Sequence, residues 1–174
     1  MRRTTSAPRL DYRNPFMQVV HTRADFGAFQ KDYFVIELGP RAGIIALKDG
    51  EVLLTRQYRF LIDAYSWEIP GGRVDEGETA ESAAARECLE ETGIECRNLR
   101  RLVEYYPGLD NFNNRTTVFA STETRAVATF SAVPSEVTEI RWFALEAALR
   151  MVFAGEILDA LTVTALLAYQ ASRL

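Results

Sequence analysis

The sequence of 174 residues is 48% hydrophobic and 25% charged, the composition of an ordinary globular domain with a sizeable core. Its net charge of −4 argues against a general nucleic-acid binder, and no apolar run reaches the roughly 18 residues that span a membrane. One histidine, His21, and two cysteines, Cys88 and Cys96, are too few for a zinc site or a disulfide framework, so we expect reduced thiols in a cytoplasmic protein.

The N-terminal segment is expected to hold a tail followed by an arm of strands. Residues 1–15 contain two prolines and several arginines, which predicts a flexible tail. Residues 16–39 predict strands at 17–22 and 33–38 around a turn at 25–27. An arm of two strands with several aromatic side chains buries too little surface alone. We therefore expect it to pack against a second copy of the chain in a homodimer.

Residues 40–174 predict a single domain in which strands, one central helix and two final helices follow one another. Strands are expected at 43–47, 51–58, 67–69, 99–106, 116–121 and 140–143, and helices at 79–92, 145–153 and 157–169. Asp49 and Gly50 form a turn dipeptide that favours a hairpin between the first two strands. This order is typical of an α/β or α+β sandwich built on a mixed sheet.

The segment from Gly72 to Ile94, GRVDEGETAESAAARECLEETGI, carries the most informative pattern of the chain. Glu87, Glu90 and Glu91 fall at positions i, i+3 and i+4 of the predicted helix, so they share one face. A hard divalent cation with oxygen ligands would offset the repulsion among these carboxylates, and Arg86 can pair with Glu90 to orient them. On the other side, we expect Ala84, Ala85, Cys88 and Leu89 to pack on the core.

The spacing of this segment is G-x5-E-x7-R-E-U-x-E-E-x-G-U, where U is apolar, and it resembles the signature of the Nudix hydrolases. The resemblance implies a Nudix-type α/β/α sandwich and metal-dependent hydrolysis of a nucleoside diphosphate linked to another group. It implies Mg²⁺, with Mn²⁺ as a substitute, held by Glu87, Glu90, Glu91 and the Gly71 carbonyl. The resemblance also implies a catalytic role for Glu91. A solvated acidic helix face is the plain alternative, which the register of Gly72, Glu78 and Arg86 disfavours.

Motifs outside the signature resemble the ADP-ribose and nucleotide-sugar pyrophosphatase branch. They are Arg56-Gln57-Tyr58-Arg59, the segment Trp67 to Gly72 and the segment Gly155 to Ala160. Pro70-Gly71-Gly72 departs from the Pro-Ala-Gly that many of these enzymes carry. The branch implies cleavage of a nucleoside diphosphate sugar to a nucleoside monophosphate and a sugar phosphate. It also implies N-terminal strands that join or exchange with a second subunit.

Several residues outside the helix are candidates for the site. Arg56 and Arg59 suit bidentate recognition of phosphate, although a strand can also direct either side chain to solvent. Glu68 lies beside the metal-binding turn in the matching motif and is a candidate for substrate contact. The resemblance implies a glutamate base on a later loop, for which Glu136 is the first choice and Glu139 the second. A plain surface carboxylate is the alternative for both.

The sequence leaves two other functions open. One is a housecleaning hydrolase of modified nucleoside triphosphates, which would release pyrophosphate instead of a sugar phosphate. The other is a non-catalytic Nudix module that senses a nucleotide and regulates a partner. The motifs at 56–59 and 155–160 argue against the first, and the complete glutamate cluster argues against the second.

Overall fold

The computed structural model describes residues 4–127 and 137–173. Contacts between residues divide the chain into two units. Unit 1 consists of Met1–Pro40 and Tyr106–Arg115, and unit 2 consists of Arg41–Tyr105 and Thr116–Leu174. Among the described residues, no helix is long and apolar enough to cross a membrane.

Unit 1 is a sheet of five strands. They are β1 (Thr4–Thr5), β2 (Arg9–Arg13), β3 (Gln18–Asp25), β4 (Gln30–Glu37) and β11 (Phe112–Asn113). β3 and β4 form an antiparallel hairpin, and β11 pairs in parallel with β4. The segment expected as a flexible tail differs from that expectation, because β1 and β2 both pair with β3. The sequence Arg-Leu-Asp-Tyr-Arg of β2 has a weak apolar pattern, and the edge of β3 away from β4 gives it hydrogen-bonding partners.

The sheet of unit 1 has almost no buried side chains. Within the described part of this unit, only Ala24 and Asn114 are buried. Large apolar side chains are exposed instead: Leu10, Tyr12, Phe16, Phe29, Phe34, Tyr106, Leu109 and Phe112. A sheet normally buries one apolar face against another layer. The described part of unit 1 therefore lacks a hydrophobic core of its own.

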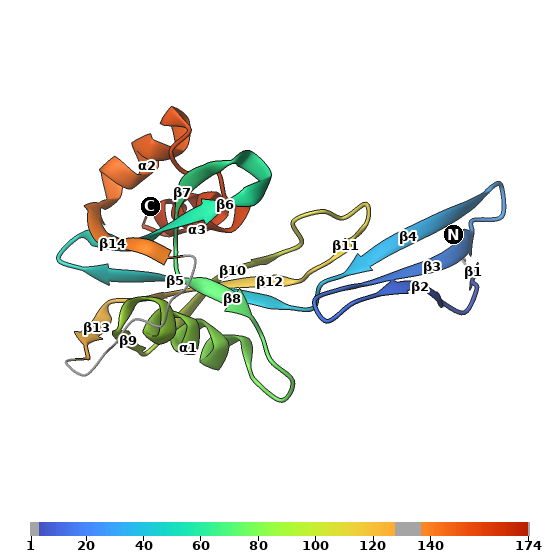
Figure 1. The fold of residues 1–174 in the computed structure, drawn as a ribbon, viewed down its shortest axis with the longest axis horizontal. Helices are drawn as coiled ribbons and strands as arrows, with labels where there is room; N and C mark the ends of the chain where they lie inside the picture. The colour runs from blue at the N-terminus through green and yellow to red at the C-terminus, as the bar shows by residue number, and fades with distance from the viewer. Residues whose placement is uncertain (1–3, 128–136, 174) are drawn as a thin grey trace. The chain divides into compact units, whose positions relative to one another are not determined.

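Unit 2 contains a mixed sheet of seven strands and three α-helices (Figure 1). The elements are β5 (Arg41–Lys48), β6 (Glu51–Arg59), η1 (Phe60–Ile62), β7 (Ala64–Glu68), β8 (Gly71–Arg73), α1 (Ala80–Thr92), β9 (Ile94–Arg97), β10 (Arg100–Tyr105), β12 (Thr116–Ser121), β13 (Glu123–Ala126), β14 (Val137–Ala144), α2 (Leu145–Ala154) and α3 (Ala160–Ala171). The strand order is β10-β12-β5-β6-β14, with β7 paired to β6 and β8 to β5. β12 and β5 are parallel, whereas the other pairs are antiparallel. The predicted mixed sheet is confirmed.

Helices cover both faces of the centre of this sheet (Figure 1). Ile44 and Ala46 of β5 pack with Cys88 of α1, while Ile45 and Leu47 pack with α2 and α3. Side chains alternate between the two faces of a strand, so a strand covered on both faces is apolar throughout. The expected α/β/α sandwich is therefore confirmed, and α1 is fixed against the sheet by one of its two cores.

Most predicted elements of unit 2 are present, with local differences. The hairpin turn has left-handed Asp49 and Gly50, with φ angles of 52° and 83°. Leu89 was expected in the core but is 38% exposed, because its position on α1 lies between the buried face and the carboxylates. The last helix begins at Ala160, not at 157, since Asp159 caps its N-terminus. The sequence pattern did not predict the two-stranded sheet that β9 and β13 form.

Candidate active site

The glutamates of the signature are carried by a helix with defined ends. Thr79 caps α1 by accepting a hydrogen bond from the Ser82 N–H, and the Ser82 side chain accepts one from the Thr79 N–H. This reciprocal cap satisfies two amide groups that the first turn leaves without helical partners. Gly93 ends the helix in the left-handed conformation with φ 69°. Local sequence thus fixes which residues of α1 lie on the same face.

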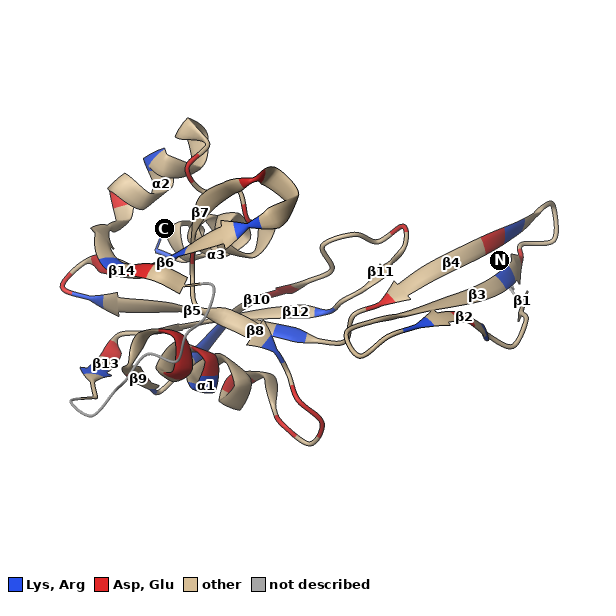
Figure 2. Cartoon of the chain, viewed as in Figure 1, with Lys and Arg blue, Asp and Glu red and all other residues tan. Residues whose placement is uncertain are grey.

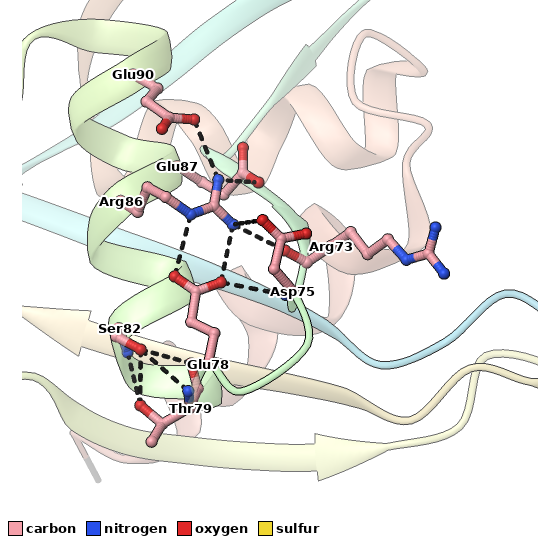
Figure 3. Close-up of polar contacts among 8 residues, drawn as sticks. All are labelled: Arg73, Asp75, Glu78, Thr79, Ser82, Arg86, Glu87 and Glu90. Carbon is pink, nitrogen blue, oxygen red and sulfur yellow. Dashed lines mark hydrogen bonds and ion pairs between the residues drawn. The ribbon is translucent and has the colours of Figure 1, made fainter. Parts of the chain in front are cut away.

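Arg86 is the centre of an ion-pair network on α1 (Figure 3). Its Nε and Nη2 atoms donate to the two carboxylate oxygens of Glu78 at 3.0 Å each. Its Nη1 atom donates to Glu87 at 2.9 Å and to Glu90 at 3.1 Å, and Nη2 also donates to the Arg73 carbonyl at 3.0 Å. The Arg86 guanidinium lowers the pKa of Glu78. The network joins α1 to the loop before it, where acidic residues gather (Figure 2).

Where the chain turns from β7 into β8, the first two residues of β8, Gly71 and Gly72, make a very close approach to α1. The Gly71 N–H donates to Glu91 Oε2 at 3.3 Å. A Cβ atom at position 72 would lie 2.3 Å from Glu87 Oε1, and one at position 71 would lie 2.6 Å from the Ala42 carbonyl oxygen. Both distances are shorter than normal Cβ contacts, so glycine at 71 lets this segment pack against β5 and glycine at 72 leaves room for the Glu87 carboxylate.

Glu91 lies in an unusual electrostatic environment. Burial, and then the nearby Glu87 carboxylate, raise the pKa of Glu91 to about 7. The Gly71 N–H and Arg59 lower this pKa, whereas the Glu68 carboxylate raises it. The same carboxylate is therefore influenced by the turn, by α1 and by the charged residues of β6 and β7.

Glu68 and Arg59 form a partly buried ion pair. Glu68 is only 3% exposed, and the Arg59 Nε donates to its Oε1 at 2.8 Å while Nη2 donates to Oε2. Arg forms strong two-pronged hydrogen bonds with a carboxylate. These two predicted substrate-binding residues therefore lie together and close enough to influence Glu91.

Arg56 and Glu139 lie on the opposite face of the sheet. Arg56 is paired with Trp67 in the register of β6 and β7, whereas Thr55 is paired with Glu68, so Arg56 and Glu68 point to opposite sides. The Arg56 guanidinium lies 4.5 Å from the centre of the Tyr65 ring. Glu139 pairs with Arg56 at 3.9 Å and with Arg141. The structure does not bring these two predicted residues to the carboxylates of α1.

Glu136, the first choice for the catalytic base, lies outside the described residues.

The predicted metal ligands of α1 differ in the exposure of their side chains. The Glu87 side chain is 16% exposed and abuts the Gly72 position, whereas the Glu90 side chain is 58% exposed. Glu87 and Glu91 therefore face the Gly71–Gly72 turn, and Glu90 lies at the solvent side of the cluster.

A cavity of about 380 Å³ adjoins the ion pair of Arg59 and Glu68. Apolar side chains of η1 and Leu158 line it together with Tyr58, Ser66 and Asp159. Ligand sites commonly combine such an apolar wall with a few polar groups. This cavity is therefore the candidate binding site for part of a substrate.

Thr162 is a buried residue that sequence reasoning missed. It is fully buried, and its Oγ1 accepts a hydrogen bond from the Ile69 N–H at 3.0 Å and donates to Asp159 Oδ2 at 2.8 Å. Ile69 lies between Glu68 and the glycine turn, so α3 holds the segment that carries both. The spacing of Asp159 and Thr162 fits a helix N-cap, and this pattern in the sequence could have indicated their contact.

The donor set of α1 suits a hard divalent cation. Glu87 and Glu91 supply carboxylate oxygens beside the Gly71–Gly72 turn, and Mg²⁺ prefers oxygen ligands. Within residues 4–127 and 137–173, no three acidic, histidine or cysteine side chains converge as a complete ion site. Glu87 and Glu90 accept hydrogen bonds from Arg86. The chemistry of these residues fits a divalent cation, which Glu87 and Glu91 would hold.

Comparisons with known proteins define the class to which this fold and site belong. The NUDIX domain family matches residues 37–161, more than half of the chain. An ADP-ribose pyrophosphatase of Mycobacterium tuberculosis is 31% identical over 142 residues, which are 79% of this chain and 68% of that protein. The chain is therefore a member of the Nudix hydrolase family. Nudix hydrolases generally use divalent metal ions.

Two further proteins are similar to this chain. CMP-5'-(N-acetyl-N-hydroxy-3-aminopropyl)phosphonate hydrolase of Streptomyces rubellomurinus is 34% identical over 134 residues, 74% of this chain. The match spans 63% of that relative, less than two thirds of its length. A crystal structure of an ADP compounds hydrolase has a TM-score of 0.85 at 18% identity and covers 99% of this chain and 94% of its own. At that identity, the similarity establishes the fold.

Proposed function

We propose that this protein catalyses Mg²⁺-dependent hydrolysis of the pyrophosphate bond of ADP-ribose or a related nucleoside diphosphate sugar. The products are a nucleoside monophosphate and a sugar phosphate. One observation carries the proposal: Glu87 and Glu91 meet the Gly71–Gly72 turn next to the buried ion pair of Arg59 and Glu68. Similarity to an ADP-ribose pyrophosphatase supports the substrate class.

Residues of α1 and the turn would hold the metal. Glu87 and Glu91 are the main ligands, Glu90 lies beside them, and the Gly71 carbonyl is the backbone ligand. Mn²⁺ is expected to substitute for Mg²⁺. When bound, a divalent cation neutralises the diphosphate and lowers the pKa of a water molecule. Arg86 keeps the helix and the preceding loop in register, which keeps the ligands in place for substrate.

The remaining residues would position the substrate and the attacking water. We assign the cavity beside Arg59 and Glu68 to one end of the nucleoside diphosphate sugar, because its charged groups adjoin Glu91 and its walls are apolar. Arg56, on the opposite face, is the weaker of the two arginine candidates. Glu136 is the proposed base, because the Glu139 carboxylate is bonded to Arg141 on that opposite face.

The similarity to a CMP-linked phosphonate hydrolase favours a second substrate class. In this candidate function, the substrate is a nucleoside 5'-monophosphate joined to a phosphonate. Both substrates contain a P–O–P linkage that starts at a nucleoside 5'-phosphate, so the same metal ligands would serve both. For a given nucleoside, only the group on the far side of the cleaved bond differs.

A substrate panel with product identification tests the proposal. The purified protein with Mg²⁺ is given ADP-ribose, GDP-mannose, UDP-glucose, a CMP-linked phosphonate and 8-oxo-dGTP, and products are identified by mass spectrometry. We expect a nucleoside monophosphate and a sugar phosphate from a sugar substrate, and no turnover with excess EDTA. Release of pyrophosphate from 8-oxo-dGTP alone would identify a housecleaning hydrolase. Tight binding without any turnover would identify a sensing module.

A further inference from the structure

The two cysteines of the chain lie side by side in the core beneath the candidate metal site. Cys88 on α1 and Cys96 on β9 are both buried and free, and their sulfur atoms are 3.6 Å apart. Neither residue has a role in the proposed hydrolysis. Cys88 follows the metal-ligand candidate Glu87 directly in the sequence.

We propose that Cys88 and Cys96 form a reversible disulfide with a peroxide as oxidant, and that this bond switches off the hydrolase. A sulfur–sulfur bond is about 2.05 Å long, so the two atoms must approach by about 1.5 Å from 3.6 Å. The two residues pack in the same hydrophobic cluster. The loss of activity rests on the function proposed above, whereas formation of the bond does not.

The chemistry requires one peroxide and two thiols. The Cys96 sulfur attacks hydrogen peroxide, so a sulfur–oxygen bond forms, the oxygen–oxygen bond breaks and hydroxide leaves to become water. The Cys88 sulfur then attacks the Cys96 sulfenic acid, which forms the disulfide and releases a second water that takes the Cys88 proton. Two thiols lose two electrons, and the peroxide is reduced to two waters.

Cys96 is the residue that meets the oxidant first. A hydrogen bond from Cys88 lowers the pKa of the Cys96 thiol, although burial opposes this effect, and a thiolate is the reactive form. Cys96 is 6% exposed, whereas Cys88 is fully buried. It lies on β9, which pairs with β13 in a two-stranded sheet.

The bond acts on the site because the Glu87 carboxylate has little room beside Gly72. A Cβ atom at position 72 would lie 2.3 Å from Glu87 Oε1, so the turn and the carboxylate are already in close contact. Drawing Cys88 toward β9 shifts the helical turn that carries Glu87 and Glu91. A misplacement of about 1 Å in a catalytic site lowers rates by up to ~100-fold, so we expect turnover to fall at least ~10-fold.

The test compares the full protein before and after treatment with hydrogen peroxide. Remaining thiols are alkylated, and peptide mass spectrometry is used to find a species in which the Cys88 and Cys96 peptides are joined with the loss of two hydrogen atoms. Turnover of the substrate chosen by the panel is measured in parallel. We expect the joined peptides to appear as turnover falls, and dithiothreitol to reverse both changes.

Cys96→Ser and Cys88→Ala are the matched controls. Each variant should keep the basal turnover and resist the peroxide, which separates the disulfide from oxidation of methionine. Two free thiols after peroxide treatment, or a disulfide with unchanged turnover, would overturn the proposal. A reduced protein that hydrolyses no substrate would refute the proposed function instead, because the joined peptides are still detected by mass.

Discussion

At the scale of single residues, the Glu91 carboxylate combines burial with a neighbouring negative charge. Its pKa is raised to about 7 by burial and by Glu87, which a bound cation would offset. We predict that Glu91→Gln keeps the fold but lowers kcat at least ~100-fold, because an amide cannot balance the charge of the metal. Steady-state kinetics at saturating Mg²⁺ and circular dichroism check this. Near wild-type turnover would refute the assignment of Glu91 as a ligand.

The two adjacent glycines should respond differently to the same substitution. In Gly72→Ala, the new methyl meets the flexible carboxylate of Glu87 at 2.3 Å, whereas in Gly71→Ala it meets the Ala42 carbonyl oxygen at 2.6 Å. We predict that Gly72→Ala lowers turnover with little change in stability. Gly71→Ala should lower the free energy of unfolding by about 1–3 kcal/mol, since backbone must move. Urea denaturation and kinetics separate the two, and equal effects on both would contradict the geometry.

The choice of catalytic base rests on two glutamates of one segment. Glu139 is held by Arg56 and Arg141 on the face away from Glu68. We predict that Glu136→Gln lowers kcat ~100-fold or more with little change in KM, because a base acts mainly in the transition state. Glu139→Gln is the matched control and should retain most of the turnover. The reverse result would assign the base to Glu139.

At the scale of elements, α3 supports the strand that leads into the glycine turn. Thr162 is fully buried and accepts the hydrogen bond of the Ile69 N–H. Thr162→Val has the same shape but leaves that N–H without a partner, so we predict a loss of about 1–3 kcal/mol in unfolding free energy. Turnover should fall as well, because Glu68 and Gly71 flank Ile69.

Thr162→Ser provides the comparison for this prediction. It keeps the hydroxyl and its two hydrogen bonds, so turnover should stay near wild type with only the small stability cost of a lost methyl, about 1 kcal/mol. Urea denaturation and kinetics of both variants check the prediction. If Thr162→Val and Thr162→Ser behave alike, packing and not the hydrogen bond sets the role of Thr162.

At the scale of the whole molecule, unit 1 poses a problem of stability for a lone chain. Among its described residues, unit 1 buries only Ala24 and Asn114, and it exposes aromatic side chains such as Phe16, Phe29 and Phe34. A sheet without a packed face has little hydrophobic stabilisation. We therefore propose a two-fold homodimer in which a second copy covers this sheet.

Light scattering checks the predicted dimer. We expect a mass of twice the 19.6 kDa of the chain at micromolar concentration. Phe34→Asp, which places a charge on an exposed position of β4, should shift the mass toward that of the monomer. A fully active protein with the mass of one chain would contradict the dimer.

Features that depend on neighbours along the chain follow from the sequence alone. The positions of Glu87, Glu90 and Glu91 on one side of α1, the end of α1 at Gly93 and the turn at Asp49 and Gly50 were all predictable. Helix periodicity and turn conformation are set by residues a few positions apart. The same local spacing makes the signature from Gly72 to Ile94 recognisable in the sequence.

The tertiary structure decided the relations between distant segments. Pairing of β6 with β7 and β14 places Glu68 and Arg56 on opposite faces, and alternation alone gives no absolute side. Thr162 reaches Ile69 across 93 residues, and Cys96 reaches Cys88 from a strand that the sequence pattern missed. Such contacts depend on strand register and on how helices pack on the sheet. For that reason a local pattern located the carboxylates, but only the packed chain showed which residues surround them.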